Sequence, residues 1–312
     1  MIFDVFHWTE YRYRSAVPLS RHVLHMKPRQ LPWQRVLSSR FEFVPKPSGF
    51  SERLDYFGNE VTDFHLDESH VGLHIKCLSR VEITPRPTPP PAETMPWEKA
   101  AAQLLALPDA DPRAFLYPSP YAPRLAALRE WVEPSFPANR PLLEGALDLA
   151  GRIRKDFTFD KAATDVGTPL GEMFASRRGV CQDFAHLQIA CLRSLGLAAR
   201  YVSGYLRTEP PPGQPRLFGA DASHAWVSLF CPGHGWIDID PTNHRLISED
   251  YVTIGWGRDY SDVSLIRGSL TGGGSHSIYL SVNVEAVEPE APAPVAAPTQ
   301  SQSQTQTQTQ KA

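Results

Sequence analysis

The feature that most constrains the fold is a glycine-bounded segment, residues 179–196, in which apolar residues recur with helical spacing. Gly179 precedes the apolar run and Gly196 closes it, as glycines at helix ends commonly do. Cys181 therefore falls in the first turn of a predicted helix. There the unpaired backbone N–H groups and the positive end of the helix dipole favour a thiolate over a thiol. On its own, this stretch is equally consistent with a nucleophile and with a cysteine of the core.

Composition limits the class of protein. The 312 residues are 42% hydrophobic, which suffices for a packed core, and the length suits about two domains. The formal net charge is -3 with both signs spread along the chain, so no nucleic-acid-binding surface is expected. The opening residues lack the basic and apolar regions of a signal peptide, and no apolar run is long enough to span a bilayer. The four cysteines show no paired framework, so a reduced, cytoplasmic protein is expected.

A change of residue pattern near residue 90 divides the chain. Before it, short runs of alternating apolar residues predict an antiparallel β-rich domain. After a proline-rich stretch, apolar residues recur with helical spacing and strand-like runs then follow. Polar low-complexity sequence at the end cannot bury a core, so we expect a disordered tail. The predicted organisation is an N-terminal β domain at 1–90, a second domain at 91–287 and the tail at 288–312.

Two predicted strands after the cysteine helix carry the polar residues that a cysteine nucleophile needs. Residues 223–230 and 235–240 are expected to form a hairpin, with His224 in its first strand and Asp240 at the end of its second. A thiolate that attacks a carbonyl needs a base to handle its proton and a third group to orient that base. Cys181, His224 and Asp240 fit these roles. The backbone N–H of Cys181 is the expected oxyanion donor, and the sequence does not identify a second one.

Other assignments stay open at this point. Asp238 shares a face with Asp240 by the period of a strand, so either carboxylate could orient the histidine. His186 and Cys191 invite a metal site together with Cys181. Their offsets of five and ten residues point in divergent directions on a helix. Zinc also prefers more closely spaced pairs, so no metal is expected.

Three ordered blocks carry a family resemblance. GVCQDFAHL surrounds Cys181, ASHAWVSLF surrounds His224 and GWIDIDPTN surrounds Asp240. With these blocks and its N-terminal region, the chain resembles the bacterial transglutaminase-like proteins of the papain-type cysteine enzyme superfamily. The resemblance implies that Cys181 is the nucleophile and His224 the base. It implies that Asp240 is the orienting carboxylate, because Asp-Pro-Thr is the family's motif at that point. One departure is His244, where a small residue would be expected.

The resemblance implies an α+β fold with an N-terminal antiparallel β domain and a papain-like transglutaminase core. In that core the cysteine-bearing helix packs on an antiparallel sheet that carries His224 and Asp240. It also implies acyl transfer from peptide or glutamine-type amides through a thioester acyl-enzyme, with no cofactor. Hydrolysis, by a peptidase or amidase, is favoured because the chain shows no calcium-binding acidic cluster of the animal type. The alternatives are protein transamidation and a non-catalytic binding module that keeps the fold.

The partner implied by the resemblance is a peptide or protein that presents an amide as substrate. Neither a nucleic acid nor a membrane is expected as a partner. The N-terminal β domain and the loop between Thr208 and Asp221 are candidate surfaces for a protein partner, both in an enzyme and in a binding module.

Overall fold

The computed structural model describes residues 1–107, 110–208, 219 and 221–287. Two predictions therefore lie outside the described residues: the disordered tail, and the part of the candidate partner loop at 209–218 and 220. Within the described ranges, no helix combines the length and the apolar character needed to cross a membrane.

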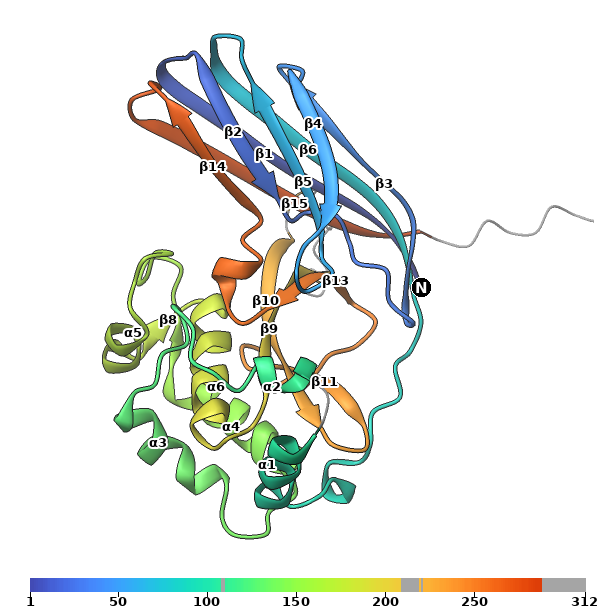
Figure 1. Cartoon of the computed structure of the whole chain (residues 1–312), viewed down its shortest axis with the longest axis vertical. Coiled ribbons are helices and arrows are strands. Elements are labelled where there is room, and N and C mark those ends of the chain that lie inside the picture. The colour runs from blue at the N-terminus through green and yellow to red at the C-terminus, as the bar shows by residue number, and fades with distance from the viewer. Residues whose placement is uncertain (108–109, 209–218, 220, 288–312) are drawn as a thin grey trace, which may run out of the picture.

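Alternating apolar and polar residues build the upper part of the molecule in Figure 1, a sandwich of two four-stranded antiparallel sheets. One sheet joins, in spatial order, β15 (His276–Val287), β1 (Ile2–Val17), β6 (His70–Ile83) and β3 (Gln34–Val44). The other joins β14 (Ile266–Thr271), β2 (Leu19–Leu24), β5 (Glu60–Leu66) and β4 (Gly49–Leu54). Apolar side chains of both sheets meet between them, among them Leu24, Phe64 and Ile75. We call these eight strands the sandwich.

In the lower part of the molecule, which we call the body, helices pack against a five-stranded antiparallel sheet (Figure 1). The sheet has the order β12 (Arg245–Leu246), β11 (Gly235–Asp240), β10 (Ala222–Cys231), β9 (Ala199–Leu206) and β13 (Tyr251–Gly257). The helices are α1 (Trp97–Ala106), α2 (Ala110–Ala114), α3 (Ala126–Val132), α4 (Leu142–Asp156), α5 (Leu170–Ser176) and α6 (Cys181–Ser194). Short 3-10 turns η1 (Pro91–Glu93), η2 (Glu133–Ser135) and η3 (Tyr260–Asp262), and the parallel pair β7 (Thr158–Phe159) and β8 (Arg178–Gly179), complete it.

Helix α6 lies at the centre of the body. Its apolar residues, such as Phe184, Leu187 and Ile189, are buried in the main core, where α6 contacts α3, α4, α5 and the strands β9 and β10. Such burial around nearly the whole circumference is typical of a central helix. The predicted α+β fold, with the cysteine-bearing helix on the sheet that carries His224 and Asp240, is confirmed.

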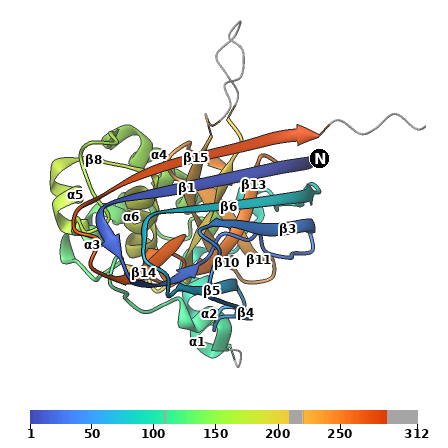
Figure 2. The same ribbon diagram turned by 90° about the horizontal axis from the view of Figure 1, so that it is seen from above.

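The last two strands return to the sandwich, which the predicted division of the chain missed. That division grouped residues 91–287 in one domain, whereas β15 pairs with β1 along its whole length and β14 pairs with β2. Figure 2 shows β15 outermost, beside β1. The alternation of residues 277–286 identifies a strand but does not say which sheet accepts it. Val282 and Val284 lie between sandwich and body, in one cluster with Tyr205.

Replacing Val284 by Ala is expected to lower the free energy of unfolding by about 1–3 kcal/mol, because buried methyl groups are lost and a cavity remains. Ile278→Ala is the matched control on the same face of β15. It should cost less than about 1 kcal/mol, because the Ile278 side chain is 55% exposed. Urea unfolding followed by tryptophan fluorescence measures both changes. Equal losses for the two variants would contradict the position of Val284 between sandwich and body.

Candidate active site

Hydrogen bonds to the Asp183 side chain fix the start of the helix that carries Cys181. The Asp183 Oδ2 accepts the Val180 backbone N–H at 2.8 Å and the Thr164 hydroxyl at 2.7 Å, so this carboxylate caps the first turn of α6. A glycine precedes the turn because a Cβ at Gly179 would lie 2.8 Å from that same oxygen. The half-buried Cys181 is the first residue of α6, and its side chain lines a pocket.

His224 and Asp240 meet beside the start of α6. The His224 Nε2 donates to Asp240 Oδ2 at 2.7 Å, and the Cys181 side chain is a further hydrogen-bond partner of the imidazole. Because Asp240 occupies Nε2, the ring nitrogen left for Cys181 is Nδ1. Asp238, the alternative carboxylate, lies instead 3.2 Å from the Arg86 Nη1. The structure thus brings Cys181, His224 and Asp240 together and places Asp238 in another ion pair.

Asp240 is fully buried, and its two oxygens accept five hydrogen bonds. Besides His224, the donors are the backbone N–H groups of Thr242 and Asn243, the Asn243 side-chain amide and the Tyr251 hydroxyl. Burial by itself raises the pKa of a carboxyl group. Here the hydrogen bond and charge of His224, with the bonds from Tyr251 and Asn243, outweigh burial and lower the pKa of Asp240 to about 2. Asp240 is therefore ionised at neutral pH.

The same contacts keep His224 protonated. Burial alone lowers the pKa of a histidine, but the hydrogen bonds with Asp240 and Cys181, and the negative charges of these partners, raise the pKa of His224 to about 10. An unperturbed histidine has a pKa of about 6.5. At pH 7 the imidazole is a cation, and it has a proton to give to a leaving group.

A pocket of about 310 Å³ opens beside Cys181. The body contributes Gln182, Tyr201, Ser203 and His224 to its lining. The sandwich contributes residues of β1, β14 and β15, so the pocket lies at the junction of the two parts of the molecule. An acyl group bound in this pocket would lie next to both the Cys181 thiol and the His224 imidazole.

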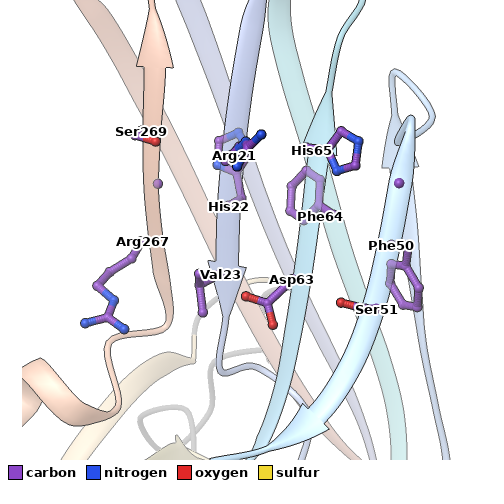
Figure 3. A pocket seen from close by; sticks show the side chains of 12 residues that line it. Arg21, His22, Val23, Phe50, Ser51, Asp63, Phe64, His65, Arg267 and Ser269 are labelled. Carbon is purple, nitrogen blue, oxygen red and sulfur yellow. The ribbon is translucent and has the colours of Figure 1, made fainter.

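A wider hollow of about 840 Å³ lies on the β14-β2-β5-β4 sheet (Figure 3). Its polar side chains include Arg21, His65 and Asp63, and the described residues that line it include no cysteine. Asp63 is paired with Arg53 at 2.9 Å. The chemistry of the lining therefore favours the smaller pocket at Cys181 as the candidate active site.

The loop that follows β13 positions Tyr260 in the lining of the Cys181 pocket. The buried Asp259 accepts the Tyr121 backbone N–H at 2.8 Å, and the His186 Nε2 accepts the Tyr260 backbone N–H at 3.2 Å. Burial lowers the pKa of His186 to about 3, so its ring is neutral and can accept this bond. The ring is stacked between Tyr121 and Tyr201. No spacing rule identifies Asp259 or His186, because both act on the loop through tertiary contacts.

Two further residues that the sequence singles out are Cys191 and His244. Cys191, considered as a metal ligand, is buried, with its Sγ 4.0 Å from the Leu128 carbonyl oxygen. The described residues contain no group of three or more side chains that could hold a metal ion. His244, the departure from the family pattern, has a left-handed φ of 51°. Such a φ is most easily adopted by glycine or asparagine, which explains why a small residue is expected there.

Comparison with known proteins places both parts of the chain. The model of the "Bacterial transglutaminase-like N-terminal region" matches residues 3–82, and that of the "Transglutaminase-like superfamily" matches residues 130–241. An uncharacterized protein of Mycobacterium tuberculosis is 41% identical over 293 residues, which cover 91% of this chain and 92% of that protein. An uncharacterized protein of Mycobacterium leprae is 32% identical over 90% of this chain and 97% of its own length.

Two further similarities are more distant. A protein-glutamine gamma-glutamyltransferase of Pseudomonas aeruginosa is 25% identical over 240 residues, which cover 77% of this chain but 31% of that protein. A candidate cysteine protease from Cytophaga hutchinsonii, known from a crystal structure, superimposes with a TM-score of 0.74 at 21% identity. That superposition covers 93% of this chain and 92% of the other. It shows a shared fold.

Among the four cysteines of the native protein, iodoacetamide is expected to modify Cys181 alone. Burial raises the pKa of Cys77 to about 11 and that of Cys231 to about 12, and it raises the pKa of Cys191 further. Thiols of this kind react slowly because the thiolate is the nucleophile. Intact-mass measurement should show a single adduct, which is absent in Cys181→Ala. Modification of a second cysteine at a comparable rate in the folded protein would contradict this assignment.

Proposed function

The chain belongs to the bacterial transglutaminase-like family, and from this premise we propose that it is a cysteine enzyme acting on peptide or glutamine-type amides. Its reacting groups would be Cys181, His224 and Asp240. The observation that carries the proposal is the 2.7 Å contact between His224 and the buried Asp240, made beside a thiol at the start of a helix. A nucleophile, a base and an orienting group in this arrangement form an acyl-transfer site.

The first half of the proposed reaction forms a thioester. His224 takes the thiol proton of Cys181, and the resulting thiolate attacks the amide carbonyl carbon. The new S–C bond displaces the carbonyl π electrons onto oxygen and produces a tetrahedral oxyanion. The backbone N–H of Cys181, at the start of α6, would serve as one donor to that oxyanion. The protonated His224 gives its proton to the leaving nitrogen, and the C–N bond breaks. An amine or ammonia departs and the acyl group stays on Cys181.

The second half releases the acyl group. A water molecule or an amine attacks the thioester carbonyl while His224 takes its proton. The S–C bond then breaks, and the sulfur leaves with the electron pair beside a protonated imidazole. Asp240 stays ionised throughout. It holds the ring by Nε2 and stabilises the imidazolium, as the third member of such a triad does.

We propose water as the principal acceptor, so that the enzyme is a peptidase or amidase. The described residues that line the pocket include no carboxylate, so none of them would pair with a protonated lysine amine. Transamidation is the second candidate. Similarity to the Pseudomonas aeruginosa protein-glutamine gamma-glutamyltransferase supports it.

The test measures ammonia release and new amino termini from glutamine-containing peptides, with and without an added fluorescent primary amine. Wild type should release product without the amine. His224→Ala should lower the rate by about 10²–10⁴-fold, because general acid–base catalysis is lost, and Cys181→Ala should abolish the thioester. His65→Ala is a matched control, because His65 lies in the wider hollow and not at Cys181. Its rate should equal that of wild type.

The outcomes separate the candidates. Incorporation of the amine into the peptide, in place of hydrolysis, would make transamidation the principal activity. A rate that is the same in wild type and Cys181→Ala would show that the chain is a binding module that keeps the fold.

A further inference from the structure

We propose that the sandwich side of the Cys181 pocket is a subsite for an apolar side chain of the substrate, next to the amide that reacts. This inference rests on the proposed function and adds a substrate preference to it. On this side, next to Thr9 and Tyr11 of β1, lie four aliphatic residues that we call the apolar wall: Leu265, Ile266, Ile278 and Leu280.

Strand pairing places half of the apolar wall on the face that looks into the pocket. Ile278 lies opposite Tyr11 and Leu280 lies opposite Thr9 in the β1–β15 ladder, and all four residues line the pocket. Residues two apart on a strand share a face, so this is also the face of the buried Val282. On this face of β15, Val282 is therefore covered by the body, whereas Ile278 and Leu280 line the pocket.

The apolar wall leaves aliphatic surface uncovered. Ile278 is 55% exposed and Leu280 is 46% exposed. Large exposed apolar side chains that are contiguous and concave usually mark a binding surface. Because this surface is part of the pocket that contains Cys181, the occupant it fits is the polypeptide whose amide reaches that sulfur.

The chemistry of the pocket also selects against charge. The described residues that line it include no Lys, Arg, Asp or Glu, and its strongest charge belongs to His224, which Asp240 already pairs. A charged substrate side chain on the apolar wall would lose its water and gain no partner, which is costly. An apolar side chain would instead cover the exposed parts of Ile278 and Leu280. Preference arises from both effects.

The neighbouring residue Tyr279 supplies an internal control. It lies between Ile278 and Leu280 in sequence but on the opposite face of β15, where its ring lies 5.4 Å from that of Trp8. It is as exposed as they are, at 53%, and it does not line the Cys181 pocket. A charge introduced at position 279 is therefore adjacent in sequence to the apolar wall but lies on the other face of the strand, outside the proposed subsite.

The experiment measures how well peptides protect Cys181 from iodoacetamide in the full-length protein. Three acetylated peptides each carry one glutamine, flanked on both sides by leucine, aspartate or lysine. The leucine peptide should halve the alkylation rate at a concentration about tenfold or more below the other two. In Leu280→Arg and in Ile278→Arg, the concentrations of the leucine and aspartate peptides that halve the alkylation rate should become more similar, or the aspartate peptide should become the better protector. Tyr279→Arg should behave as wild type.

Equal protection by the three peptides, or no protection by any of them, would overturn the subsite. So would a shift in Tyr279→Arg as large as that in Leu280→Arg, because a general charge effect would then account for it. The alkylation rate without peptide tests the proposed function separately. If iodoacetamide alkylates wild type faster than His224→Ala but the three peptides protect equally, the proposed subsite is wrong, whereas the proposed activation of the Cys181 thiol by His224 is retained. If the two rates are equal, both proposals fail.

Discussion

The burial of one carboxylate, that of Asp240, is the interaction on which the arrangement of the site depends. A buried charge is strongly unfavourable unless it is paired and hydrogen-bonded. Asp240 obtains its partners from three places: His224 on β10, the turn after β11, and Tyr251 on β13. Removing one partner of such a buried pair typically costs about 3–5 kcal/mol. The folded sheet therefore holds these elements together, and the orientation of His224 follows from that requirement.

A second constraint is that both ends of the described chain must come together before the pocket exists. The strands β14 and β15 leave the body and complete the sandwich, where β15 pairs with β1. The Tyr205 hydroxyl of β9 lies 2.7 Å from the Nδ1 of the buried His7 on β1, which joins sandwich and body beside the pocket. The body contributes Cys181 and His224 to the pocket, and strands β14 and β15 contribute Ile266, Ile278 and Leu280. The pocket therefore exists only where the sandwich and the body meet.

Local patterns in the sequence predicted the parts of the site that local structure determines. The helix that starts at Cys181 and the β10–β11 hairpin that carries His224 and Asp240 both follow from periodicity and turn residues. The choice between Asp238 and Asp240 needed the tertiary structure, because both residues share a face of one strand. The resemblance pointed to Asp240, and the hydrogen bond from His224 places that residue at the imidazole.

The features that the sequence did not reveal depend on contacts between distant segments. The alternation of β15 predicts a strand but not that β1, far away in the chain, is its partner. Tyr251 hydrogen-bonds Asp240 from a strand that carries no recognisable motif. Asp259 and His186 support the loop of Tyr260 by burial and backbone hydrogen bonds. None of these roles is encoded in the spacing of residues along one element.

The protonation state of His224 is the most direct test of the coupled Cys181, His224 and Asp240 site. Nitrogen NMR of isotope-labelled histidine, assigned with His224→Ala, reports whether one or both ring nitrogens carry a proton. The folded pKa of about 10 lies above the ordinary value of about 6.5, so at about pH 8 the imidazole should be doubly protonated. Its proton should be lost only as the pH rises towards 10. Asp240→Asn should move this titration to lower pH. A neutral His224 at about pH 8 in the wild-type protein would contradict the account.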